Sequence, residues 1–251
     1  MSLLAVAGLA KSYGGVEAVA GVDFALAEGE FLALIGPNGA GKTTCFNMLG
    51  GQIRPDRGTI RFAGGDITGL APRRISRLGV ARTFQITQSF GSMSVRENVQ
   101  LALVAYHRRI FSFLPRAAEL YRGEAMALLE RVGMAAQAER LCGILAYGDL
   151  KRVELAIALA QAPRLLLMDE PTAGMAAQER LALMALAARL ARAQGISLVF
   201  TEHDMDVVFA HADRIIVLDR GRILAEGPPA AVRADRRVRE VYLGSGAMFA
   251  A

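Results

Sequence analysis

The segment from Gly36 to Thr44 has the residue types and spacing of a phosphate-binding loop, or P-loop. Its glycines let backbone N–H groups close around a phosphate, and its lysine supplies positive charge to the outer phosphates. The apolar run Phe31–Ile35 precedes it and the helical run Thr44–Leu49 follows it, a context that disfavours an incidental glycine turn. The predicted nucleotide-binding residues are Gly36, Pro37, Asn38, Gly39, Ala40, Gly41, Lys42, Thr43 and Thr44, with the Thr43 hydroxyl also a Mg²⁺ ligand.

Two carboxylates, Asp169 and Glu170, follow the apolar run Leu165–Met168. Ligands bind at the carboxyl ends of strands in open α/β sheets, so this position suits a site. We predict that Asp169 holds the Mg²⁺ shell and that Glu170 polarises an attacking water, as phosphoryl transfer to water requires. An acidic turn before Pro171 is the plain alternative, and the upstream P-loop disfavours it for the pair.

The remaining pattern indicates how these residues are positioned. Short or alternating apolar runs predict a strand-rich opening quarter, and later continuous runs separated by helices such as Gln178–Arg192 predict buried parallel strands. The early runs are Leu3–Val6, Val16–Leu26, Phe31–Ile35 and Thr59–Phe62, and the later ones are Leu165–Met168, Ser197–Thr201 and Ile215–Leu218.

Between these strands, from Ser94 to about Arg140, the apolar period shifts towards 3.6 residues. Ser94 and Glu97 have the spacing of a capping box, and Leu120, Leu128, Leu129 and Val132 fall on one helix face that Gly133 ends. The predicted fold class is therefore α/β, a P-loop NTPase core with an antiparallel β subdomain and an α-helical subdomain inserted at about residues 94–160. Residues 1–251 form a single domain in this interpretation.

Composition excludes several other classes. The 251 residues are 53% hydrophobic and 21% charged, which argues against disorder, and the apolar runs are too short to span a bilayer. The basic residues, 29 against 24 acidic, are mostly dispersed and form no stripe with aromatic residues, so no nucleic-acid partner is expected. Cys45 and Cys142 are expected to be two buried thiols of a cytosolic protein, whose first strand starts near Ser2.

Five further segments resemble the ATP-binding subunits of ABC transporters, and the resemblance covers nearly all of the chain. They are Tyr13 in Lys11–Gly15, Gln85 after Gly79–Phe84, Leu145–Asp149, Ala173–Ala176, and His203 in Thr201–Asp204. Taken singly, each has a plain structural interpretation, but their order around the P-loop favours the family.

The resemblance implies a role for each segment. Tyr13 would stack on adenine, Gln85 would sense Mg²⁺ and the γ-phosphate and face a membrane subunit, and His203 would contact the γ-phosphate. Ala146, Tyr147 and Gly148 would form the signature that addresses the nucleotide of the opposite subunit. The cofactors are then ATP and Mg²⁺, the catalytic residues Glu170, His203 and Gln85, and the metal-site residues Thr43, Gln85 and Asp169.

The signature departs from the family's usual Leu-Ser-Gly-Gly-Gln at Ala146, Tyr147 and Asp149. The Asp149 carboxylate adds negative charge where a triphosphate should dock, so weaker closure of the two subunits is expected. Ala176 stands where many relatives have an Asp. The hydrogen bond between subunits that the resemblance implies would therefore lack its usual carboxylate.

Other segments resemble the ATPases of branched-chain amino acid importers, namely Ile67–Leu70, Ala81–Gln85, Glu202–Val208 and Val238–Gly244. This implies a peripheral subunit on the cytoplasmic face of the inner membrane, with polytopic membrane subunits, a second ATPase subunit and, indirectly, a periplasmic solute-binding protein as partners. The alternatives are an ATPase for lipopolysaccharide or lipid extraction, a soluble ABC ATPase acting on ribosomes or DNA, and a nucleotide-binding regulator that does not hydrolyse.

Overall fold

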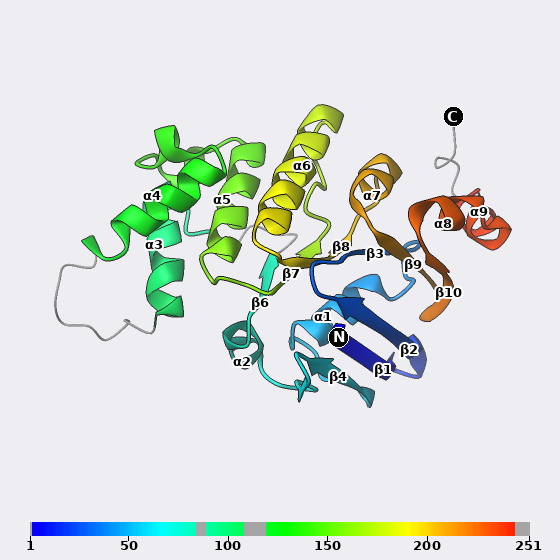
Figure 1. Ribbon diagram of the computed structural model, residues 1–251. Helices are drawn as coiled ribbons and strands as arrows, with labels where there is room; N and C mark the ends of the chain where they lie inside the picture. Colours follow the sequence, from blue (N-terminus) through cyan, green and yellow to red (C-terminus); the bar gives the residue numbers. More distant parts are fainter. Residues whose placement is uncertain (1, 84–88, 108–118, 244–251) are drawn as a thin grey trace.

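A six-stranded sheet runs through the centre of the protein (Figure 1). The structure is a computed structural model that describes residues 2–83, 89–107 and 119–243. Its order is β10-β9-β3-β8-β7-β6, and all neighbours are parallel except the edge pair β9 and β10. The strands are β3 (Phe31–Ile35), β6 (Val80–Thr83), β7 (Leu165–Asp169), β8 (Ser197–Thr201), β9 (Arg214–Asp219) and β10 (Arg222–Gly227). Every residue of β3, β7 and β8 is buried, which explains their nearly continuous apolar sequence.

The opening quarter forms a second, antiparallel sheet of order β2-β1-β4-β5, which confirms the predicted strand-rich start. Its strands are β1 (Ser2–Tyr13), β2 (Val16–Ala27), β4 (Arg57–Phe62) and β5 (Gly65–Asp66). The first strand is much longer than the predicted Leu3–Val6. The ladder shifts register around Gly8, whose φ is 58°, and resumes at Leu9. This extension carries the strand on to Tyr13.

Helices cover both faces of the central sheet (Figure 1). Besides the inserted helices, they are α1 (Lys42–Leu49), α2 (Pro72–Arg77), α6 (Ala177–Ala193), α7 (Met205–His211), α8 (Pro229–Ala234) and α9 (Arg236–Leu243). Successive side chains of a strand point to opposite faces of the sheet, so alternate residues belong to two separate apolar cores, one on each face. On β8, Phe200 packs with α6 and α7, whereas Val199 packs with α1 and the antiparallel sheet.

In its described residues, the predicted insertion includes α-helices and short 3₁₀ turns, grouped beyond the β6 edge of the sheet (Figure 1). They are α3 (Val95–Tyr106), α4 (Arg122–Arg131), η2 (Ala135–Gln137), η3 (Cys142–Ile144) and α5 (Tyr147–Leu159). Their shared apolar core includes Val99, Leu129 and Val153, each fully buried. The α4 helix ends before Gly133, as predicted, but begins after Leu120, so that leucine is not on its face.

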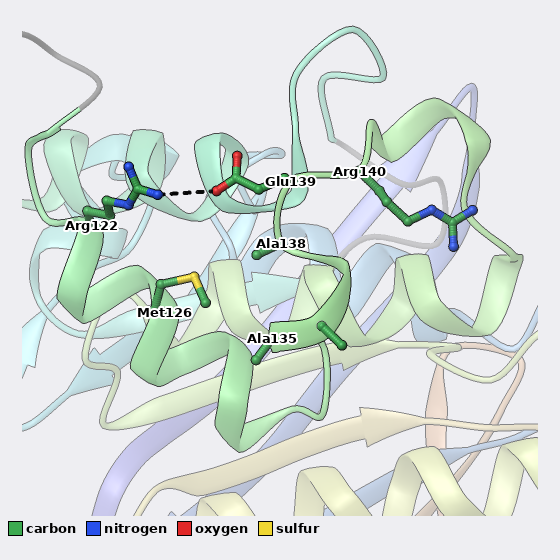
Figure 2. Close-up of a pocket in the computed structure, with 7 residues that line it drawn as sticks. Arg122, Met126, Ala135, Ala138, Glu139 and Arg140 are labelled. Carbon is green, nitrogen blue, oxygen red and sulfur yellow. Dashed lines mark ion pairs between the residues drawn. The ribbon is translucent and has the colours of Figure 1, made fainter.

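Ion pairs tie the insertion together at the surface. Glu139 lies 2.7 Å from Arg96 and 3.6 Å from Arg122, and Figure 2 shows the second pair at the rim of a shallow pocket between α4 and η2. Arg140 donates from the other side of η2 to Gln137, at 2.7 Å. The exposed pair of Arg122 with Glu139 contributes little stability, so the apolar core is the main interaction that holds these helices together.

The expectation for the two cysteines is confirmed. Cys45 and Cys142 are both free and buried. Burial raises the pKa of the Cys45 thiol to about 12, which makes it an inert core residue. Within the described ranges, no helix combines the length and apolar composition that crossing a membrane requires.

The predicted capping box at the start of α3 is present, and it gives the first testable prediction. The Ser94 hydroxyl accepts from the Glu97 N–H at 3.2 Å, and the Glu97 carboxylate accepts from the Ser94 N–H at 2.7 Å. Ser94→Ala should lower the free energy of unfolding by about 1 kcal/mol, measured by urea denaturation. Glu97→Gln is the matched control, because an amide oxygen completes the same box. Equal stability of both variants would contradict a stabilising role for the cap.

Candidate nucleotide-binding site

The P-loop lies between β3 and α1, as predicted. At two of its glycines, other backbone segments come so close that a side chain would not fit. A Cβ at Gly36 would lie 2.2 Å from the Leu218 carbonyl oxygen, and one at Gly41 would lie 2.3 Å from that of Ala18. Gly41 also has a φ of 102° at the start of α1. Larger residues would open the loop, so its tight curvature depends on these glycines.

Lys42 is buried within this loop. Its ammonium donates to the Gly36 carbonyl at 2.7 Å and to the Pro37 carbonyl at 3.1 Å. Burial lowers the pKa of Lys42, while the charges of Glu170 and Asp169 act in the opposite direction. Carbonyl groups carry only partial charge, so a phosphate would be a stronger partner for this ammonium.

The two carboxylates lie at the carboxyl end of β7. Asp169 accepts at Oδ1 from the Thr201 hydroxyl at 2.9 Å and at Oδ2 from the Arg82 guanidinium at 2.9 Å. Glu170 has a φ of 48°, and its N–H donates to the Thr201 hydroxyl oxygen at 2.9 Å. This left-handed conformation is unfavourable for a glutamate, and its hydrogen bond to β8 helps to maintain it.

His203 follows β8 and meets Glu170 across the strand ends. Its Nε2 lies 2.8 Å from Glu170 Oε1, and the histidine side chain is 50% exposed against 17% for the glutamate. The structure therefore joins two residues that the sequence places in separate motifs. A carboxylate next to an accessible imidazole can orient a water and accept its proton.

One cleft brings together three of the predicted segments. The antiparallel sheet contributes Tyr13, the P-loop contributes Asn38 to Thr44, and the end of β7 contributes Glu170. Tyr13 is 47% exposed, so its ring is available to a ligand. A polar loop rich in N–H groups between an aromatic ring and a carboxylate suits a nucleotide.

The signature segment lies elsewhere in the chain. Ala146, Gly148 and Asp149 line a separate cleft with Met175 and Glu179. Within one chain, the structure does not bring Ala146, Tyr147 and Gly148 into the cleft of the P-loop.

The two departures from the usual motifs have visible local surroundings. Gln137 Nε2 donates to Asp149 Oδ2 at 2.9 Å, so a neutral group from η2 engages this carboxylate. Ala176 starts α6 without a side-chain cap. Gln85, predicted as a catalytic and metal-site residue, lies outside the described residues.

Two further residues make contacts near the site, although the sequence predicted no role for them. Glu202 is buried and accepts from the Thr172 N–H at 2.9 Å and from the Thr172 hydroxyl at 2.6 Å. It thereby links the segment after Glu170 to the one carrying His203. The side chain of Arg82 is only 10% exposed and lies against Asp169. The sequence did offer a sign of both residues, because Arg82 lies within the apolar strand β6 and Glu202 directly follows the apolar strand β8.

A parallel sheet, a glycine loop opening a helix, and an acidic strand end together define a P-loop nucleotide-binding protein. The family model described as ABC transporter matches residues 19–173, and one described as branched-chain amino acid ATP-binding cassette transporter matches residues 222–247. The chain belongs to the ABC transporter family and is an ATPase of the cassette type. The resemblance seen in its motifs is confirmed.

Similar proteins span nearly the whole chain. The high-affinity branched-chain amino acid transport ATP-binding protein LivG of Salmonella typhimurium is 41% identical, over 96% of this chain and 98% of its own. BraF of Pseudomonas aeruginosa, described in the same words, is 39% identical over the same shares. A solved ATP-binding cassette of an ABC transporter in its ADP conformation has a TM-score of 0.86 at 30% identity, covering 97% of this chain and 99% of that one. The predicted P-loop NTPase fold is therefore confirmed.

The burial of Glu202 generates a prediction about pH. Burial raises its pKa above the usual 4.5, and the hydrogen bonds from Thr172 oppose this only in part. The folded state therefore binds more protons than the unfolded state between the two pKa values, and stability is lost as pH rises through that window. Glu202→Gln keeps an acceptor for Thr172 but cannot titrate. Its stability relative to the parent should therefore rise with pH above about 4.5.

Urea denaturation at a series of pH values measures this difference. Glu28→Gln, at a side chain that is 65% exposed, is the matched control. A stability difference between Glu202→Gln and the parent that does not change with pH would contradict the prediction.

Proposed function

We propose that this chain is the ATP-hydrolysing subunit of an ABC importer for branched-chain or related amino acids. The observation that carries the catalytic part is the cleft in which Tyr13, the P-loop and Glu170 converge, with His203 at 2.8 Å from Glu170. The solute class is supported by the relatives with 39–41% identity and by the family model at residues 222–247.

In this proposal the nucleotide lies along the cleft from Tyr13 to Glu170. Its base stacks on the Tyr13 ring, which contributes about 1–3 kcal/mol. Its phosphates take the N–H groups of Gly39 to Thr44 at the start of α1. The Lys42 ammonium exchanges its two carbonyl partners for phosphate oxygens, a charge-assisted interaction that is stronger than those it replaces.

The oxygen ligands near the loop suit Mg²⁺. Thr43 is exposed in the cleft and Asp169 lies at the adjoining strand end, whereas no group of three or more His, Cys, Asp or Glu among the described residues could hold a metal. Mg²⁺ usually takes one or two protein oxygens and completes its shell with phosphates and waters. The proposed site therefore consists of Thr43, Asp169 and Gln85, and the ion would neutralise developing phosphate charge.

Hydrolysis is assigned to Glu170 and His203. Glu170 accepts the proton of the attacking water, and its strained backbone aims the carboxylate at the cleft. His203 holds Glu170 through the contact to Oε1 and can donate to the γ-phosphate from its exposed side. Gln85 is the third predicted catalytic residue and keeps that role in the proposal.

The complete site requires a second subunit. Ala146, Tyr147 and Gly148 start the 13-residue helix α5, whose N–H groups can bind phosphate, but they lie outside the P-loop cleft of their own chain. An arrangement with twofold or pseudo-twofold symmetry would supply this helix end to the opposite nucleotide. We further propose that residues 94–160 form the helical subdomain, and that polytopic subunits bind near Gln85 at the cytoplasmic face of the inner membrane.

Purification from the native membrane tests the transport assignment. We expect polytopic membrane subunits to accompany the chain, and a periplasmic solute-binding protein to deliver solute to them. Proteoliposomes with these partners should take up branched-chain or related amino acids when ATP is present. Lipid-extraction partners, ribosomes or DNA-repair proteins in place of these subunits would contradict the proposal.

The assignment of Lys42 predicts loss of nucleotide affinity without unfolding. Lys42→Ala removes a charged partner of the phosphates, so ATP affinity should fall about 10- to 100-fold, measured by calorimetry. The melting temperature should stay near that of the parent, because the ammonium donates to carbonyl groups of its own loop. Near-normal ATP binding by a folded Lys42→Ala protein would contradict the site.

The assignment of Glu170 predicts slow turnover with nucleotide binding retained. Glu170→Gln should reduce hydrolysis by about 10²–10⁴-fold, the usual span for loss of a general base. Because ATP then persists, the variant should form a nucleotide-bound dimer in sedimentation experiments. Unchanged turnover would move the catalytic role to another residue, and lost ATP binding would make Glu170 a binding group instead.

A further inference from the structure

A largely buried arginine side chain contacts the acidic end of β7. Arg82 lies on β6 opposite Leu167 of β7, and its side chain is only 10% exposed. Leu167 and Asp169 point to the same face of β7, because side chains alternate along a strand. That face packs against α1, so Arg82, Asp169 and the helix of the P-loop meet on one side of the sheet.

The guanidinium bridges these elements with both of its terminal nitrogens. Nη2 donates to Asp169 Oδ2 at 2.9 Å. Nη1 donates to Asn47 Oδ1 and to Gln52 Oε1, each at 2.9 Å, at and beyond the end of α1. A planar fork held at both arms has little freedom to rotate, which distinguishes it from a lysine at the same place.

Removing the Arg82 guanidinium from water is unfavourable, and the negative charge of Asp169 offsets this. Burial lowers the pKa of Arg82, while the charge of Asp169 acts in the opposite direction. Asp169 accepts at its other oxygen from Thr201. Both carboxylate oxygens thus have a donor, which fixes the rotamer of Asp169, and part of its charge is already compensated by the guanidinium.

We propose that Arg82 is a positioning residue that fixes the orientation of Asp169 and limits the negative charge that it offers to the divalent cation of the nucleotide complex. This inference rests on the proposed function, because it concerns the metal site of that reaction. The guanidinium and the cation compete for one carboxylate. Loss of the guanidinium should therefore strengthen cation binding while it loosens the carboxylate and slows turnover. A purely structural role would weaken both.

The test uses Mn²⁺ as the probe, measured by electron paramagnetic resonance in the full-length chain with ATP. A Glu170→Gln background keeps the nucleotide intact. Adding Arg82→Gln should increase Mn²⁺ affinity about three- to tenfold, as expected for the loss of one screened charge. In the Glu170 parent, Arg82→Gln should lower kcat at least about tenfold, with little change in the KM for ATP. Unchanged or weaker Mn²⁺ binding by a folded Arg82→Gln variant would overturn the proposal.

Arg164→Gln is the matched control, because it removes the same charge at the opposite end of β7, where Arg164 forms an exposed ion pair with Glu28. It should leave both measurements unchanged, and an increase in Mn²⁺ affinity equal to that of Arg82→Gln would refute a local effect. If Arg82→Gln does not fold, Arg82→Lys decides. It keeps the charge but not the fork, so kcat should fall while Mn²⁺ affinity stays within about twofold. Parental kcat would then refute the positioning role.

These outcomes separate the inference from the function on which it rests. Failure of the Glu170→Gln parent to bind Mn²⁺ together with ATP would refute the proposed site itself. Binding by that parent without the expected response to Arg82 would refute only the positioning role.

Discussion

The parallel pairing of β7 with β8 is the constraint on which the site depends. In this register Asp169 is opposite Thr201, whose hydroxyl holds both the Asp169 carboxylate and the Glu170 N–H. The residues that leave the two strands, Glu170 and His203, then meet at 2.8 Å. A shift of one residue would exchange the two faces of β8 and bury Thr201 on the wrong side of the sheet. The cores on both faces therefore fix the relative placement of Glu170 and His203 as well as the fold.

Burial on both faces explains why such a site can be strained and charged. Fully buried strands hold the strand ends rigidly, so the left-handed conformation of Glu170 persists despite its cost. The same rigid framework holds Lys42 against the Gly36 carbonyl and Arg82 against Asp169, and both basic side chains have little contact with solvent. Charges in these surroundings interact more strongly than they would at the surface, which suits a site for a highly charged ligand.

The sequence predicted most of what is local and less of what is remote. The P-loop, the acidic end of β7 and the capping box depend on neighbouring residues, so their spacing identified them. Arg82 and Glu202 acquire their contacts from segments that are distant in the chain, and no local pattern revealed these partners. The extension of β1 to Tyr13 was missed because a register shift around Gly8 interrupts the alternation. The small strand β10 and the short helices after β8 lacked enough periodicity to predict.

The balance of charge gives a physical reason for two subunits. Lys42 and Arg82 oppose Asp169 and Glu170 within one chain, and Arg82 is already engaged by Asp169. A nucleoside triphosphate remains negative even with one Mg²⁺, so its outer phosphate needs further donors. The first N–H groups of α5 have no partner within the helix and carry positive dipole charge, yet they lie in a different cleft. The hydrogen bond from Gln137 to Asp149 gives the acidic residue of that helix end a partner within its own chain. In the proposed two-subunit site, this leaves the amides around Gly148 to a nucleotide held by the opposite subunit.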